Sequence, residues 1–135
     1  MPKPPTTADL TWIRGLQFEA TSGAHTITLD GNSSAGPSPV QTLAISLAGC
    51  MSIDVADILT KGRHPFRAIR SRLDAERAPD DPHRFTRVTL AFTVEGGVPQ
   101  DAVARAIALS HDKYCSVWHS MRQDIAFTTA FEVQP

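Results

Sequence analysis

The stretch GPSPVQTLAISLAGCMSID, residues 36–54, decides how this chain of 135 residues folds. It opens with the chemistry of a helix start, because Ser38 suits the N-cap position, Pro39 the first helical position and Gln41 the third. A run of small and aliphatic residues follows. The pattern therefore predicts a long helix that begins directly after Ser38.

The predicted helix runs to about Lys61, where Gly62 can close it. Apolar side chains occupy nearly every side of this helix: Val40, Leu43, Ile45, Leu47, Met51, Ile53, Val55, Ile58 and Leu59. A helix that is apolar all round must be covered all round, and one sheet covers only one side. We therefore predict that a second copy of the chain covers the other side, which makes the protein a homodimer.

Length and composition suit one folded domain. Residues 1–8 are predicted to form a loose tail and residues 9–135 a single domain, since 41% of the chain is hydrophobic and 20% is charged. The net charge of -1 gives no broad electrostatic attraction to nucleic acid or to an anionic membrane, so neither is an expected partner. The N-terminus resembles neither an export signal nor a membrane-spanning start, so we expect a reducing cytoplasm and free cysteines.

Strand patterns flank the helix. Residues 9–20 and 25–30 predict a first hairpin, and residues 66–77 and 84–96 alternate in polarity and predict a second. Residues 99–114 have helical periodicity, which we expect to continue by a turn or two through residues 115–121. A last strand is predicted over residues 124–133. The order favours an α+β fold with a mostly antiparallel sheet.

One stripe of the predicted central helix is polar. Because each residue turns an α-helix by 100°, this polar stripe contains Ser46, Cys50, Asp54, Asp57 and Lys61. A carboxylate on such a helix needs a partner, so Asp54 is expected to pair with an arginine from Arg14, Arg67, Arg70 or Arg72. Cys50 is either a small buried residue beside Gly49 or a reactive thiol, and the local sequence leaves both interpretations open.

The second cysteine has histidine neighbours. If residues 99–121 form one helix, His111 and His119 flank Cys115 one turn away on either side, and a protonated imidazole there would favour a thiolate. The same three residues could hold a metal ion, with Cys50 as a further ligand. The histidines could also be part of a solvated helix surface.

Several segments together resemble the OsmC/Ohr family of small bacterial proteins, in particular its OsmC-like, YhfA-type branch. They are GPSPVQTLAISLAGCMSIDVADIL, the second hairpin with the helix after it, and ALSHDKYCSVWHSM. The most specific parts are the G-x-S-P helix start ending in A-G-C, the I-D-V after the cysteine and the late K-Y-C-S-V. The resemblance runs from about Trp12 to Val133.

The resemblance implies an OsmC-like fold in which an antiparallel sheet wraps around a long central helix, in an intertwined homodimer with sites at the subunit interface. It implies that Cys50 is the peroxidatic cysteine that attacks a peroxide O–O bond and that Cys115 is the resolving cysteine that closes an intrasubunit disulfide. A thiol reductant of the dithiol or lipoyl type then reduces the disulfide. Neither a cofactor nor a metal is implied.

This sequence departs from the pattern of the family's peroxidases at two positions. Val40 stands where they have a glutamate, and Ser22 stands near the place of their activating arginine. Activation or support of the thiol would then come from other residues, namely Asp54, Arg14, Arg67, Arg70, Arg72, His25 or His119.

The sequence and the resemblance therefore favour two possible functions. The first is a thiol-dependent peroxidase, or a related redox protein of the antioxidant stress response, that reduces organic hydroperoxides whose alkyl part the apolar helix can bury. The alternative is a non-catalytic dimeric module of the same fold that binds a small apolar ligand, which Val40 at the glutamate position favours.

Overall fold

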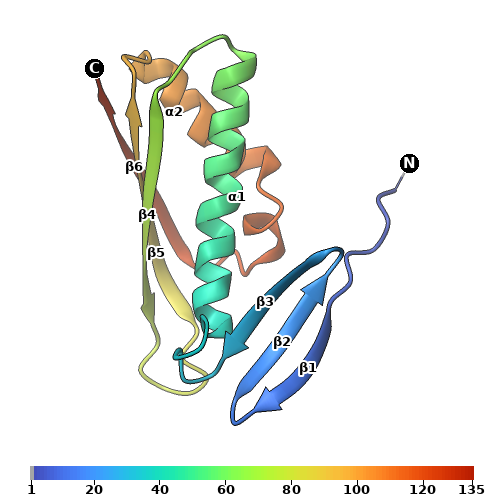
Figure 1. Ribbon diagram of the computed structural model, residues 1–135. Helices are drawn as coiled ribbons and strands as arrows, with labels where there is room; N and C mark the ends of the chain where they lie inside the picture. The colour runs from blue at the N-terminus through green and yellow to red at the C-terminus, as the bar shows by residue number, and fades with distance from the viewer. Residues whose placement is uncertain (1) are drawn as a thin grey trace. The chain divides into compact units, whose positions relative to one another are not determined.

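The computed structural model describes residues 2–135 and has an α+β fold, as predicted (Figure 1). The elements are β1 (Asp9–Arg14), β2 (Gln17–Ser22), β3 (His25–Asp30), α1 (Pro39–Lys61), β4 (Ala68–Arg77), β5 (Phe85–Glu95), α2 (Gln100–Leu109), a π-helical turn η1 (Ser110–Tyr114), a 3₁₀ turn η2 (Trp118–Ser120) and β6 (Ala126–Gln134). The chain divides into two compact units, of which the first ends at Leu43 and the second is Ala44–Pro135.

The first unit is a three-stranded antiparallel sheet in the order β1-β2-β3. The prediction of one strand over residues 9–20 was wrong, because a turn at Gly15, whose φ is +51°, splits it in two. Cross-strand pairing places Trp12 opposite Phe18 and Phe18 opposite Leu29, so apolar side chains gather on one face. Trp12 is 60% exposed, which leaves this apolar face without a cover inside the unit.

The connection from β3 to α1 is held by side chains that bind the backbone. Buried Asp30 accepts hydrogen bonds from the N–H groups of Asn32 (2.8 Å) and Ala35 (2.9 Å). The bond from Ala35 and then that from Asn32 hold the pKa of the Asp30 carboxyl below its usual value. Ser38 Oγ accepts the N–H of Gln41 and Gln41 Oε1 accepts the N–H of Ser38, which confirms the predicted helix start as a reciprocal capping box.

The C-terminal end of α1 falls at Lys61, as predicted, but its geometry differs from the prediction. The residue with positive φ is Arg63 (+60°) and not Gly62. The N–H of His64 donates to the Leu59 carbonyl, and the N–H of Arg63 donates to the Thr60 carbonyl. These two bonds form a Schellman motif, in which the left-handed position falls one residue after the glycine.

The second unit contains a sheet in the order β4-β5-β6. Strands β4 and β5 are antiparallel, with Ile69 opposite Val94 and Leu73 opposite Leu90, so the predicted alternation of the hairpin is confirmed. Strand β6 runs parallel to β5, which makes it the one parallel neighbour in this sheet. A parallel strand needs a crossover connection, which α2 and the two turns after it supply.

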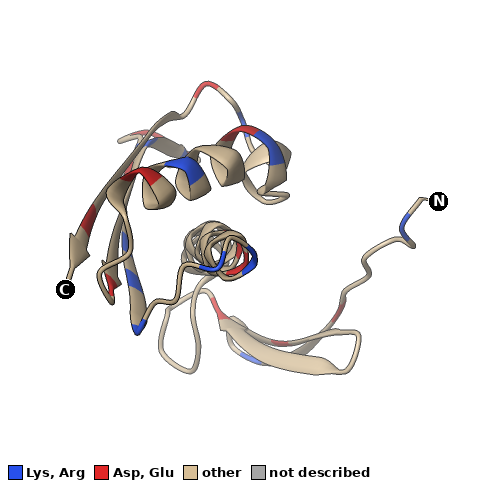
Figure 2. Ribbon diagram, turned by 90° about the horizontal axis from the view of Figure 1, so that it is seen from above, with Lys and Arg blue, Asp and Glu red and all other residues tan. Residues whose placement is uncertain are grey.

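The core of this unit lies between one face of the sheet and two helices. Helices α1 and α2 cover the same face of β4–β6 (Figure 1, Figure 2). The buried apolar side chains are Leu47, Met51, Val55 and Leu59 of α1, Val88, Leu90, Phe92 and Val94 of β5, and Val103, Ala106 and Ile107 of α2. By length and composition, α1 is the one helix within residues 2–135 that could cross a membrane. Its buried stripe identifies it as a core helix.

The end of α1 generates a stability prediction. Arg63 has a Cβ in the left-handed region, which costs about 1–2 kcal/mol, whereas glycine adopts this conformation freely. We expect Arg63→Gly to raise the free energy of unfolding by about 0.5–1 kcal/mol, after the entropy that glycine loses on folding. Urea denaturation measures the change. Lys61→Gly, at a regular helical position, is the control and should lower stability; a loss in both variants would contradict the assignment.

Candidate functional site

The rotation of α1 fixes where its polar stripe points. Leu47, Met51, Val55 and Leu59 recur every fourth residue and are almost completely buried. Cys50 precedes Met51 by one position, so it lies at the edge of the buried stripe, where its side chain is half-buried. A cysteine at such an edge touches the core and keeps a route to solvent.

The segment that carries Cys115 leaves the helix before the cysteine. Helix α2 ends at Leu109, a π-helical turn covers Ser110–Tyr114, and Cys115 itself is extended, with φ -72° and ψ 99°. The N–H of Cys115 donates to the Ser110 carbonyl at 2.8 Å. The prediction of one continuous helix was therefore wrong, and His111 and His119 do not flank Cys115 on a common helix face.

An aromatic cluster anchors this segment on β6. The ring of Trp118 lies 4.7 Å from that of Phe127 and 5.8 Å from that of His111, measured between centroids, and the His111 and Phe127 rings are 5.5 Å apart. Trp118 is 4% exposed. Burying the Trp118 indole contributes more stabilising free energy than a further regular helical turn would, which is a physical reason why the chain departs from the helix.

The structure brings the two cysteines together. The Cys115 thiol is completely buried and lies close enough to the Cys50 thiol for the two groups to interact. Burial raises the pKa of the Cys115 thiol to about 11. The backbone N–H of Trp118 lies 3.3 Å from the sulfur and opposes this rise in pKa, whereas the neighbouring Cys50 adds to it. Two free thiols from distant parts of the sequence therefore lie next to each other. Cys50 is half-buried, whereas Cys115 is buried and protonated.

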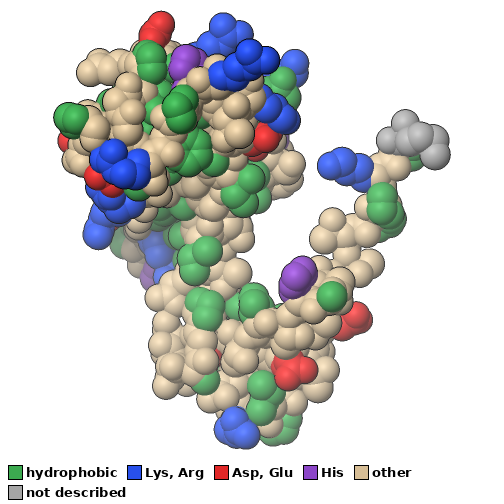
Figure 3. Space-filling model, turned by 45° about the horizontal axis from the view of Figure 1, so that its top comes forward, with side chains coloured by type: hydrophobic (Ala, Val, Ile, Leu, Met, Phe, Trp, Pro, Cys, Tyr) green, Lys and Arg blue, Asp and Glu red, His purple; other side chains and the backbone are tan. Residues whose placement is uncertain are grey.

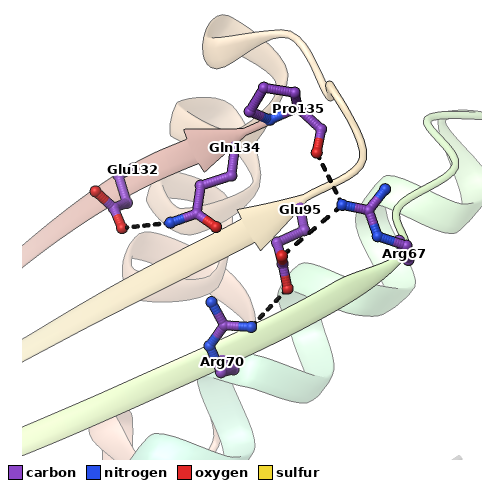
Figure 4. A network of polar contacts seen from close by, with 6 residues as sticks. All are labelled: Arg67, Arg70, Glu95, Glu132, Gln134 and Pro135. Atoms are coloured by element: carbon purple, nitrogen blue, oxygen red, sulfur yellow. Dashed lines mark hydrogen bonds and ion pairs between the residues drawn. The ribbon is translucent and has the colours of Figure 1, made fainter.

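The partner of Asp54 differs from the prediction. Asp54 Oδ2 accepts a hydrogen bond of 2.7 Å from the hydroxyl of Ser110. The expected arginines bind elsewhere: Arg67 and Arg70 bind Glu95 (Figure 4), Arg72 binds Asp74, and Arg14 donates to Gln17. Arg70 and Arg72 alternate with the inward positions of β4 and are exposed, which explains why they do not reach α1. Because Asp54 is only half-buried, a hydroxyl and solvent can satisfy it without a cation.

The histidines make contacts within their own loop. His119 Nε2 donates to the His111 carbonyl at 2.9 Å, and His111 Nδ1 lies 2.8 Å from Asp112 Oδ1. Within residues 2–135 there is no group of three or more His, Cys, Asp or Glu side chains arranged to hold a metal. The alternative of a site formed by His111, Cys115 and His119 is therefore corrected, since the extended backbone at Cys115 separates the ligand directions.

A cavity of about 350 Å³ lies beside the cysteine segment. It is lined by Asp54, Asp57, Ile58, Lys61 and Tyr114. Lys61 Nζ is 2.8 Å from Asp57 Oδ2, so this pair is neutral together and Asp54 supplies the remaining charge. Asp54 lies one turn after Cys50 and Tyr114 directly precedes Cys115, so the cavity adjoins both cysteine segments.

Two residues of the site were missed at the level of sequence. Ser110 shares the helical periodicity of Val103, Ala106 and Ile107 within residues 99–114, and its hydroxyl is the signal that was overlooked, because a polar group at a core position needs a partner. Trp118 was assigned only to a helical continuation. Its contacts with His111 and Phe127 join distant segments, so no local pattern points to them.

The raised pKa of Cys115 predicts a loss of stability in alkali. Its value of about 11 in the folded protein lies above the value of about 8.5 for an unfolded thiol, so the native state holds this proton more tightly. The stabilisation is complete below about pH 8.5 and is lost as the pH rises through about 11. Over this range the unfolding free energy of the reduced wild type should fall by on the order of 2 kcal/mol more than that of Cys115→Ala. Parallel pH profiles in urea denaturation would contradict the shift.

Comparisons with known proteins agree with this architecture. A family model described as OsmC-like protein matches residues 30–130. Protein YhfA of Escherichia coli (strain K12) is 41% identical over 130 residues, covering 93% of this chain and 96% of that protein.

Among solved structures, a hypothetical protein from Aquifex aeolicus VF5 is 24% identical with a TM-score of 0.91, covering 98% of this chain and 99% of that one. The organic hydroperoxide resistance protein OsmC from Legionella pneumophila, also described as a predicted redox protein, is 14% identical with a TM-score of 0.73, covering 98% and 99% of the two chains. At these identities both structures support the fold alone. The family model and the E. coli relative show that the chain belongs to the OsmC-like protein family.

Proposed function

We propose that this protein is a thiol-dependent peroxidase that reduces organic hydroperoxides through Cys50 and Cys115. The observation that carries the proposal is the contact between the two thiols, one half-buried and the other completely buried. A peroxidatic thiol must meet its oxidant, and a resolving thiol must meet only the oxidised sulfur. The two environments match these two tasks.

In the proposed reaction the Cys50 thiolate attacks one oxygen of the hydroperoxide, ROOH. The O–O bond breaks, the alkoxide takes up a proton and leaves as the alcohol ROH, and Cys50 becomes a sulfenic acid. The Cys115 thiol then attacks the Cys50 sulfur, and the hydroxyl of the sulfenic acid leaves with the thiol proton as water. The product is a disulfide, which an external dithiol, of lipoyl type or similar, reduces to two thiols.

The order of attack follows from exposure and protonation. Cys115 is inaccessible to an external peroxide, and with its pKa raised to about 11 by burial it stays protonated at neutral pH. Since the thiolate is the nucleophile, Cys50 is the better candidate for the first step. In the second step Cys115 passes its proton to the departing hydroxyl as the S–S bond forms, so that the leaving group is water.

The substrate class rests on the apolar surface near α1. Ile45 and Ile53 of this helix are 62% and 69% exposed in the single chain, so an alkyl group that binds where two copies of the chain meet can pack on them. The Legionella relative is named for resistance to organic hydroperoxides, which agrees with this class. The chemistry needs no cofactor beyond the thiols, and it requires a compartment that regenerates them, which favours a reducing cytoplasm.

We also propose that the active form is a homodimer. Large apolar side chains remain exposed in both units of the single chain (Figure 3): Leu10, Trp12, Leu16, Phe18 and Ile27 in the first, and Ile45 and Ile53 in the second. An apolar face on a three-stranded sheet does not stand alone in water. A second copy offers the same apolar surfaces in a symmetric arrangement.

The alternative function is a binding module that keeps the fold without efficient chemistry. By the resemblance to the family, Val40 stands where its peroxidases have a glutamate and Ser22 near the place of their activating arginine, which favours this alternative. The second unit also has a cavity of about 400 Å³ between α2 and β6, with Ile107, Phe127 and Phe131 in its lining, which could hold a small apolar ligand.

Thiol counting distinguishes the two functions. After one equivalent of tert-butyl hydroperoxide we expect both thiols of the reduced wild type to disappear within seconds, because each turnover consumes two thiols and yields one disulfide. Cys50→Ser should keep its remaining thiol, and Cys115→Ser should stop at a sulfenic acid that dimedone traps. Two unreacted wild-type thiols after an hour would reject the peroxidase and favour the binding module.

The dimer is tested at Ile53, the most exposed large apolar side chain of α1. The wild type should show twice the 14.6 kDa chain mass in light scattering coupled to size exclusion. Ile53→Glu places a charge in the proposed interface and should shift the mass toward one chain, at a cost of several kcal/mol of association energy. Gln100→Glu, an exposed position at the start of α2, is the matched control. A wild type of 14.6 kDa would exclude the dimer.

A further inference from the structure

Ser110 is a completely buried polar residue at the junction between α2 and the cysteine segment. A buried hydroxyl is costly unless it is hydrogen-bonded, so its single side-chain bond decides its position. That bond is the one of 2.7 Å to Asp54 Oδ2, which joins the π-helical turn to α1. The N–H of Ser110 donates to the carbonyls of Ala106 and Ile107, which joins the same residue to α2.

The carbonyl of Ser110 holds Cys115. It accepts the Cys115 N–H at 2.8 Å, a bond that spans five residues and therefore closes the π-helical turn. Directly after this bond the backbone becomes extended at Cys115. The position of the Cys115 sulfur thus depends on where the Ser110 backbone is held, and Asp54 helps to hold it.

Asp54 lies one helical turn after Cys50 on α1. One stretch of this helix therefore carries the first sulfur and, through the hydroxyl and carbonyl of Ser110, also fixes the backbone of the second. We propose that Ser110 is a positioning residue that holds Cys115 against Cys50 so that the disulfide closes rapidly. The inference rests on the proposed thiol chemistry and deepens it.

Two reactions compete for the Cys50 sulfenic acid. In one reaction the Cys115 thiol displaces water and forms the disulfide. In the other a second hydroperoxide oxidises the sulfenic acid to the sulfinic acid and leaves as the alcohol, which ends turnover. Loss of the Ser110 hydroxyl slows only the first of these reactions, because the second consumes only the Cys50 sulfenic acid and a hydroperoxide.

The test compares Ser110→Ala with wild type, with Ser120→Ala as the matched control. Ser120 lies in the same loop, is exposed and donates to the Ser116 carbonyl, away from α1. Stopped-flow mixing with tert-butyl hydroperoxide should give sulfenic acid formation within about twofold of wild type in both variants. Disulfide closure should slow by about tenfold or more in Ser110→Ala alone, since small misplacements of reacting groups cost one to two orders of magnitude. Mass spectrometry should then find more Cys50 sulfinic acid at high peroxide.

Substitutions at Asp54 separate positioning from simple loss of structure. Asp54→Asn keeps an oxygen that can accept the Ser110 hydroxyl, so closure should stay within about twofold of wild type, whereas Asp54→Ala should match Ser110→Ala. Closure in Asp54→Asn as slow as in Asp54→Ala would overturn the role of this hydrogen bond. So would closure in Ser110→Ala at the wild-type rate.

A redox titration without peroxide keeps this inference separate from the proposed function. In a glutathione buffer the effective molarity of the thiol pair should fall by about tenfold in Ser110→Ala and stay unchanged in Ser120→Ala. If the wild type does not react with peroxide but Ser110→Ala still has the lower effective molarity, the peroxidase proposal fails and the positioning role stands. An unchanged effective molarity in Ser110→Ala rejects the positioning role, whatever the reactivity toward peroxide.

Discussion

The packing of one stripe of α1 on the sheet is the constraint on which the rest of the second unit depends. Leu47, Met51, Val55 and Leu59 are almost completely buried and recur at helical spacing, so they fix the rotation of the helix. Cys50 and Asp54 each precede a member of that stripe, and the same rotation turns them toward the segment after α2. The place of the candidate nucleophile is thus a consequence of core packing.

Features with local causes could be predicted from the sequence. The helix start depends on Ser38 and Gln41, which are three residues apart, and the capping bonds are those expected. The register of β4 and β5 follows from strict alternation on two strands joined by residues 78–84, which leaves one pairing that buries both apolar faces. In each case the residues that decide the structure are close together in the chain, so the sequence pattern contains the whole signal.

Features that depend on distant contacts could not be predicted. The periodicity of α2 continues through Ser110, yet the chain leaves the helix because Trp118 gains more by packing on Phe127 of β6. Asp54 finds a hydroxyl far along the sequence, where the charge pattern pointed to arginine. Arg63 takes the left-handed position beside a glycine that could have taken it, and only the two bonds of the helix end reveal which residue does so.

The unequal burial of the two thiols gives the proposed chemistry its direction. A thiol that is completely buried and protonated is protected from an external oxidant, whereas its half-buried neighbour is accessible. In the proposed reaction, oxidation makes the Cys50 sulfur an electrophile, and the departing hydroxyl of the sulfenic acid accepts the proton that burial retains on Cys115. Desolvation at Cys115 would slow a first attack on peroxide, but it does not hinder a second step in which no net charge is created. In the proposed reaction, the same burial that stabilises the core therefore also sets the order in which the two sulfurs react.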